Sequence, residues 1–106
     1  METMSIEAYG ILWFTNSANY TDYRSICEDA GSMPATYAQW KKKTEHLLVG
    51  LLREGKTYIK VKAGADEFRA WCAKTGRDLN AAGRIDFATF KAHEKIGQSH
   101  PSQKDQ

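Results

Sequence analysis

The sequence predicts a small α+β domain, mostly helical, with about four helices and two short strands in the order strand, helix, helix, strand, helix, helix. The first observation behind this fold class is residues 36–54, TYAQWKKKTEHLLVGLLRE, where apolar residues recur every three or four positions, as on one face of a helix. The second is residues 57–63, TYIKVKA, which alternate as a half-exposed strand does. The third is size, because 106 residues with 11% aromatic side chains suffice for one core.

We expect a single globular domain over residues 8–96, with a frayed segment at 1–7 and a polar, disordered tail at 97–106, GQSHPSQKDQ. The first residues hold no basic segment followed by an apolar run, so they predict no signal peptide. No apolar run reaches the roughly 18 residues of a membrane span. The two cysteines form no paired motif, which fits a reducing cytoplasm as the location.

In residues 8–15, AYGILWFT, aromatic or branched side chains occur at both the odd and the even positions. This favours a strand covered on both faces, although a run this short also suits a helix. Asn16, Ser17 and Asn19 then offer N-caps for a helix over residues 20–29. The inner face of that helix carries Tyr20, Tyr23, Ile26 and Cys27. Residues 30–34, AGSMP, are a turn into the next helix.

The helix over residues 36–54 is the element around which the rest is expected to pack. Its core-facing arc is predicted to contain Tyr37, Trp40, Thr44, Leu47, Leu48, Leu51 and Leu52. Ser32 and Pro34 suit the entrance of this helix, and Gly55 suits its exit. Val49 falls on the polar face, where an apolar side chain indicates contact with a partner.

Residues 57–63 place Ile59 and Val61 on one side of a strand and lysines on the other. Acidic residues begin the next helix, over residues 66–75, and Gly76 ends it. Its inner arc is predicted to hold Phe68, Trp71, Cys72 and Thr75. Two strands alone make a weak sheet, so either the helices cover it or a second chain extends it.

The last helix is expected from Asn80, as N-cap, to about residue 95, and it has two apolar faces. The first is made of small or branched residues: Ala81, Ala82, Ile85, Ala88, Ala92 and Ile96. Phe87 and Phe90 lie roughly opposite. A helix that is apolar on two sides is either wedged between other elements or offers one side to a partner.

The motifs TYAQWKKK, GKTYIKVKAGADEFRAWCAKTG and GRIDFATF resemble a group of small uncharacterised bacterial proteins with a TYxxW helix, a Lys/Val strand and an EFxxWC helix. The matching positions are Thr36, Tyr37, Trp40, Lys60, Val61, Glu67, Phe68, Trp71 and Cys72. The resemblance covers residues 20–95 and implies one compact bacterial domain. Because the group has no known activity, the resemblance implies no functional site.

A helix-turn-helix over residues 23–43 is one interpretation of the first two helices. Gly31 would lie at the turn, and the outward side chains able to contact DNA would be Thr36, Gln39, Lys42 and Lys43. The alternative is an ordinary helical hairpin. The second helix is longer than recognition requires, and Glu28, Asp29 and Glu45 would repel phosphates, so the hairpin is favoured.

No pattern indicates catalysis, a cofactor or a metal. Cys27, Cys72, His46 and His93 match no zinc spacing, and both cysteines fall on apolar helical faces where a thiol acts as a small hydrophobe. No nucleophile lies beside a base, and no glycine-rich phosphate loop is present.

We therefore predict a non-catalytic module that binds a protein partner or a second copy of itself, with Phe87, Phe90 and Val49 as the candidate contact residues. A small DNA-binding regulator is the alternative. A net charge of +2 is too small to decide for nucleic acid.

Overall fold

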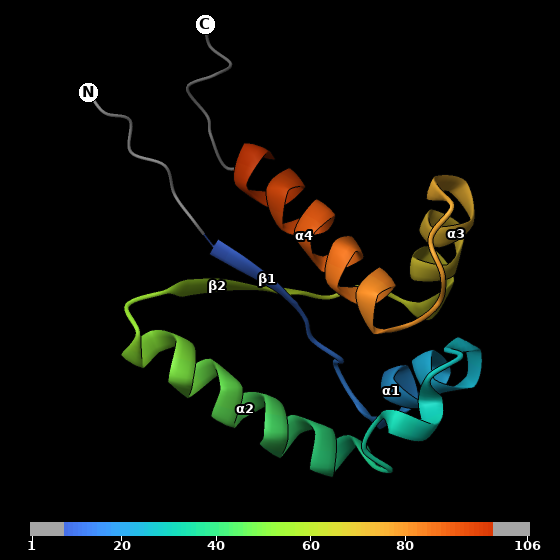
Figure 1. Ribbon diagram of the computed structural model, residues 1–106, viewed down its shortest axis with the longest axis horizontal. Coiled ribbons are helices and arrows are strands. Elements are labelled where there is room, and N and C mark those ends of the chain that lie inside the picture. The colour runs from blue at the N-terminus through green and yellow to red at the C-terminus, as the bar shows by residue number, and fades with distance from the viewer. Residues whose placement is uncertain (1–7, 99–106) are drawn as a thin grey trace, which may run out of the picture.

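The computed structural model describes residues 8–98, and the predicted order of helices and strands is confirmed (Figure 1). The elements are β1 (Ala8–Leu12), α1 (Ser17–Ile26), the 3-10 turn η1 (Ala30–Ser32), α2 (Tyr37–Arg53), β2 (Thr57–Val61), α3 (Ala65–Thr75) and α4 (Ala81–Gln98). The expected frayed start at 1–7 and most of the expected tail lie outside the described residues, while residues 97 and 98 belong to α4.

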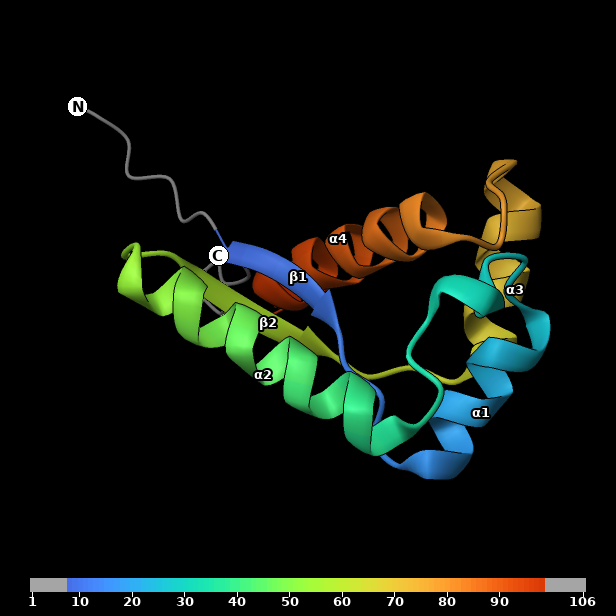
Figure 2. The same cartoon turned by 60° about the horizontal axis from the view of Figure 1, so that its bottom comes forward.

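Within the described residues, β1 and β2 form a two-stranded parallel sheet, in register from Ala8 opposite Thr57 to Leu12 opposite Val61. Parallel neighbours need a long crossover, which α1, η1 and α2 provide here. Figure 2 shows α2 and α4 on opposite sides of the strands. α4 lies mainly against β1, and α2 lies against β2. The sheet is thus covered on both faces by helices of its own chain.

The α4 side of the sheet is packed closely because β1 has a glycine there. A Cβ atom added to Gly10 would lie 2.3 Å from the carbonyl oxygen of Ala88, so only glycine lets the α4 backbone approach this far. Leu12 packs on the same side, against the buried residues Val61, Ala88 and Ala92. On the other side of β1, the ammonium of Lys60 lies 4.0 Å from the centre of the Trp13 ring.

The main core lies beyond the end of the sheet, where α1, α3 and α4 meet. Its buried members are Phe14, Tyr20, Tyr23, Cys27, Ala65, Phe68, Cys72 and Phe87. The rings of Tyr23 and Phe68 stack with their centres 5.4 Å apart. The hydroxyl of Tyr23 donates to the carbonyl oxygen of Ala63 at 3.0 Å, which satisfies the polar end of a fully buried side chain. Desolvation accordingly raises the pKa of Tyr23.

Local sequence accounts for the helix ends. The Oδ1 atom of Asn16 accepts from the Asn19 amide at 2.8 Å, so α1 begins earlier than the predicted residue 20. Thr36 caps α2 with a reciprocal capping box to Gln39, which corrects the expectation that Ser32 and Pro34 form the entrance. The exits were predicted correctly: the two glycines at the ends of α2 and α3, Gly55 and Gly76, have φ angles of 77° and 75°.

The core-facing arc predicted for α2 is partly wrong. Only Leu48 in α2 is buried, while Leu47 and Leu52, which flank the arc, are 55% and 56% exposed. The reason is the narrow sheet, since two strands cover only the central stripe of a helix packed against them.

The two-faced helix α4 is wedged between the sheet and α3. Ala88 and Ala92 contact the sheet side, and Phe87 is fully buried with its ring 5.4 Å from the rings of both Phe68 and Trp71. This corrects the expectation that Phe87 is a surface residue available to a partner. The predicted N-cap is confirmed, because Asn80 Oδ1 accepts from the Gly83 amide at 3.0 Å.

Candidate functional site

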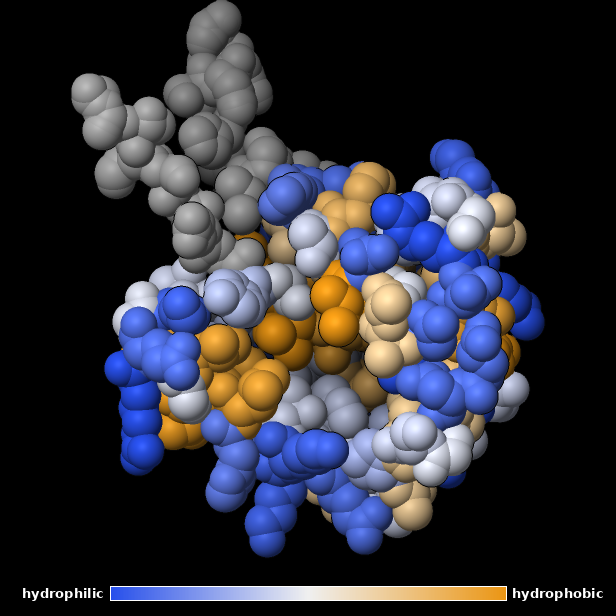
Figure 3. Space-filling model, in the orientation of Figure 1, coloured by the Kyte–Doolittle hydropathy of each residue, from blue (hydrophilic) through white to orange (hydrophobic). Residues whose placement is uncertain are grey.

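An open depression lies between α2 and α4, and we call it the α2–α4 groove. It is lined by Gly10, Ile11, Leu12, Phe14, Trp40, Thr44, Leu47, Ala81, Arg84, Ile85 and Ala88. Figure 3 shows this face hollowed near its centre, with apolar side chains on both sides of the hollow. The lining comes from β1, from Phe14 just after it, and from α2 and α4. None of it comes from β2, so the groove lies on the side of β1 that faces away from its partner strand.

The floor of the α2–α4 groove is the free edge of β1. The Trp13 amide donates to the Val61 carbonyl oxygen at 2.8 Å, which fixes the direction of the ladder. Because polar groups of successive residues alternate between the two sides of a strand, the amides and carbonyls of Gly10 and Leu12 point away from β2. No other described strand pairs with this edge. The floor therefore presents backbone donors and acceptors flanked by apolar walls.

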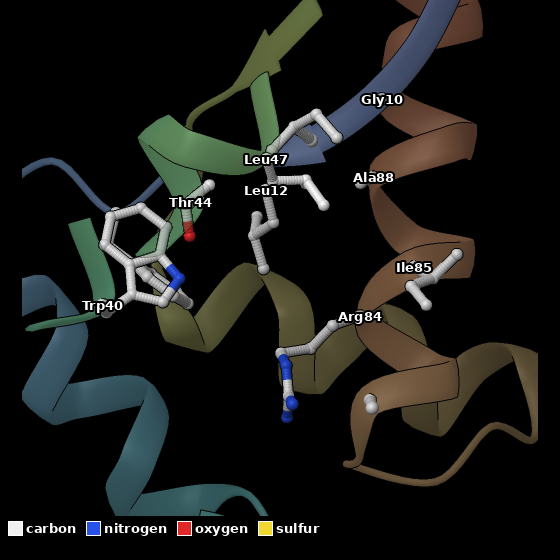
Figure 4. A pocket seen from close by; sticks show the side chains of 11 residues that line it. Gly10, Leu12, Trp40, Thr44, Leu47, Arg84, Ile85 and Ala88 are labelled. Carbon is white, nitrogen blue, oxygen red and sulfur yellow. The ribbon is translucent and has the colours of Figure 1, made fainter. Parts of the chain in front are cut away.

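The two walls carry apolar side chains that the fold leaves uncovered. Figure 4 shows Leu47, from α2, and Ile85, from α4, on opposite sides of the groove. They are 55% and 64% exposed. Thr44 and Trp40 continue the α2 wall toward the core. Single exposed apolar side chains are ordinary, but Leu47 and Ile85 face one groove over a strand edge that no other described strand pairs with, and so form one continuous surface.

Arg84 is the charged side chain among the lining residues, and its charge is already paired. Its Nη1 and Nη2 atoms donate to the two carboxylate oxygens of Asp29, at 2.8 Å each. The hydrogen bonds from Arg84 lower the pKa of Asp29, although partial burial opposes them. The pair leaves little free charge in the groove, which suits an apolar occupant better than an ionic one.

The size of the groove bears on the class of ligand. Its volume is about 240 Å³ and it is open to solvent along one side. Pockets for drug-sized ligands or cofactors usually measure roughly 300–1,000 Å³ and enclose most of the ligand. The α2–α4 groove fits a segment of polypeptide laid along it better than a small molecule.

The candidate contact residues named from the sequence do not form one site. Val49 is 49% exposed on the outer side of α2, and it lines a depression with His46, Gly50 and Arg53. Phe90 is 42% exposed and lies against Trp71 of α3, with ring centres 5.6 Å apart. Neither Phe90 nor Phe87 lines the α2–α4 groove or the depression that holds Val49.

The helix-turn-helix interpretation requires four side chains that are free to contact DNA, and the structure leaves only two of them free. Thr36 and Gln39 are tied to each other in the capping box of α2. Lys42 and Lys43 are exposed, and with Gln39 and His46 they line a second depression on the outer side of α2. Residues 27–36, including the η1 turn, separate α1 from α2, a longer connection than the 3–4 residues of a usual helix-turn-helix.

The two cysteines are not activated nucleophiles. Both are buried, and burial raises the pKa of the Cys27 thiol and of the Cys72 thiol. His46 and His93 are exposed on different helices. Across residues 8–98, no group of three or more His, Cys, Asp or Glu side chains is placed to hold a metal ion.

Sequence reasoning missed the groove, although it named Leu47 and Ile85, the exposed residues of its two walls. Leu47 was assigned to the core and Ile85 to a small apolar face, and both assignments follow from helical periodicity. The unpaired edge of β1 has no local signature, because strand pairing is decided between segments far apart in the chain.

Comparison of the chain with protein-family models, with curated proteins and with solved structures found no match. The resemblance to small bacterial proteins stays a prediction. None of the helices within residues 8–98 combines the length and hydropathy that a bilayer span requires.

Proposed function

We propose that this chain is a non-catalytic interaction module that binds an extended segment of a protein partner along the free edge of β1. The observation that carries the proposal is the unpaired edge of β1 at the floor of a groove whose two walls expose Leu47 and Ile85. Addition of a strand to an open sheet edge is a recurring mode of peptide recognition, in which the backbone supplies affinity and the walls supply specificity.

The physics of a two-stranded sheet supports an added strand. A sheet of two strands is marginal, and a third strand would give the backbone groups of Gly10 and Leu12 partners that they lack inside the described chain. Alternate side chains of the new strand would point toward α2 and toward α4. Leu47 would cover the first set and Ile85 the second.

The position of α4 supports a separate partner rather than a second copy. Two identical strands related by a two-fold axis pair antiparallel, and their covering helices then lie on the same face of the sheet. Neighbouring strands are about 4.8 Å apart, whereas packed helices need roughly 8–10 Å between their axes. Because α4 lies mainly on β1, in close contact at Gly10, two copies joined through β1 would bring their α4 helices too close.

The test is selection of binding peptides from a displayed random 12-residue library, followed by titration of the best synthetic peptide into the labelled protein. We expect slowed amide hydrogen exchange at Gly10 and Leu12, whose amides face the groove. Leu47→Asp and Ile85→Asp should each weaken binding at least tenfold, because either places a charge against an apolar strand. Leu52→Asp is the matched control, since Leu52 is similarly exposed but lies outside the groove lining.

Two results would contradict the proposal. One is a selected peptide that binds equally well to the Leu47→Asp and Ile85→Asp variants and leaves the exchange of β1 amides unchanged. The other is a stable dimer in light scattering that these two substitutions dissociate, which would make a second copy the occupant of the groove.

A further inference from the structure

We infer that the outer face of α2, on the side turned away from the core, binds the phosphate backbone of duplex DNA. This surface is separate from the α2–α4 groove and does not depend on the function proposed for it. We call it the α2 basic face and define it by its residues: Gln39, Lys42, Lys43, His46, Val49, Gly50 and Arg53.

The charge of the α2 basic face is of one sign. Lys42, Lys43 and Arg53 are cations, all exposed, and no Asp or Glu lines either of the two depressions along this part of the described helix. No ion pair with a described carboxylate is found for any of the three. Glu45 borders the face, one helical turn from Lys42. The cations are therefore free to meet an anionic partner.

The geometry of α2 makes these charges a rigid row. α2 is held at both ends, by the capping box at Thr36 and by the left-handed Gly55. Between Lys42 and Arg53 the helix advances about 16 Å at 1.5 Å per residue. That length matches several phosphates of one DNA strand, which follow each other at about 3.4 Å along the duplex axis. A helix capped at both ends presents its cations to a phosphate backbone without ordering its own backbone, so only the side chains lose conformational freedom.

The composition of the face favours duplex DNA over other anionic partners. Single-stranded nucleic acid is held mainly by large aromatic rings that stack on bases, and the α2 basic face has no Phe, Tyr or Trp. A helix that binds membranes inserts its apolar side. Here the centre of that side, Leu48, is buried in the chain's own core, and the exposed Leu47 lies in the α2–α4 groove. A protein interface usually has an apolar centre, and Val49 alone would supply it.

The experiment measures retention of a 20-base-pair duplex of mixed sequence over a series of salt concentrations, by fluorescence anisotropy. We expect the slope of log K against log salt to be about −3 for the wild type, since each neutralised phosphate contributes about −0.9. Lys42→Gln, Lys43→Gln and Arg53→Gln should each reduce the slope by about 1, with a similar loss on every sequence. Glu45→Gln should strengthen binding, because it removes the bordering carboxylate.

Lys74→Gln is the matched control. It removes one positive charge from an exposed position in α3, so it should leave the slope unchanged if the α2 basic face is the site. The inference is overturned if the combined Lys42, Lys43 and Arg53 variant binds duplex as the wild type does. It is also overturned if the wild type does not bind duplex at low salt, whether or not it binds phosphatidylserine vesicles.

Discussion

Arg84 and Asp29 form a bidentate ion pair that ties the start of α4 to the turn after α1. The Nη1 and Nη2 atoms of Arg84 each lie 2.8 Å from a carboxylate oxygen of Asp29. The two side chains are only 15% and 24% exposed. The pair joins segments 55 positions apart in the chain, beside the end of the α2–α4 groove. The pair is bidentate and its side chains are the least exposed among the ion pairs of the described residues. Removal of one partner should therefore destabilise the fold more here than at the other pairs.

Replacement of Arg84 by Met should lower the free energy of unfolding by about 2 kcal/mol, because the carboxylate of Asp29 loses two charge-assisted hydrogen bonds while it stays partly buried. Urea denaturation at neutral pH measures the change. The control is Asp86→Asn, which breaks the more exposed pair between Arg77 and Asp86 and should cost less than about 0.5 kcal/mol. Equal losses in the two variants would contradict this ranking.

The same pair predicts a dependence of stability on acid. Arg84 holds the pKa of Asp29 below its ordinary value of 3.8, so the folded state binds fewer protons than the unfolded state in that range. The contribution of Asp29 is fully present above pH 5 and is lost as the pH falls through the lowered pKa. The stability difference between wild type and Asp29→Asn should hence be constant above pH 5 and shrink below pH 4. A difference that widens in acid would refute the assignment.

Gly10→Ala should lower the free energy of unfolding by about 1–3 kcal/mol or more, because the new methyl group would overlap the backbone of α4 at Ala88. This range is the usual cost of overpacking. Thermal unfolding followed by circular dichroism measures the effect. Gly50→Ala is the counterpart, since a methyl group there meets no atom within 4 Å and the residue lies inside α2. That variant should gain about 0.5–1 kcal/mol. A neutral Gly10→Ala would mean that α4 is less closely packed than described.

Phe87 and Phe90 should differ sharply although both are phenylalanines of α4. Phe87→Ala should cost about 3–5 kcal/mol because it empties a fully buried site, whereas Phe90→Ala should cost about 1 kcal/mol or less at a 42% exposed site. Chemical denaturation of the two variants measures both losses in the free energy of unfolding. If Phe87→Ala is too unstable to study, Phe87→Leu gives the same ranking with a smaller loss. A larger loss for Phe90 would reverse the assignment of core and surface.

Both cysteines should react slowly while the protein is folded. Burial raises the pKa of each thiol, and Cys72 Sγ also lies 3.8 Å from the Asp78 carbonyl oxygen, to which it can donate. A disulfide-exchange reagent at pH 8 should label the native protein roughly tenfold or more slowly than the urea-unfolded protein. Rapid labelling of one thiol in the native state would show that its part of the core opens readily.

The local features of the fold could be read from the sequence. Periodicity located α2, alternation located β2, and Gly55, Gly76 and Asn80 marked helix boundaries where the structure places them. These features depend on neighbours within one or two turns, and their physical causes are hydrogen bonding of the end groups and left-handed backbone conformation. The same local signals predicted the buried, hydrophobic role of Cys27 and Cys72.

Tertiary structure alone decided which apolar residues are covered. Helical periodicity places Leu47 and Leu48 on one apolar arc of α2, but a sheet of two strands covers Leu48 and leaves Leu47 beside an open groove. Phe87 is buried because α3 happens to pack against that side of α4. The parallel pairing, the free edge of β1 and the contact of Arg84 with Asp29 join segments distant in sequence. A residue's own sequence neighbours fix its direction, whereas its burial depends on what the rest of the chain places in front of it.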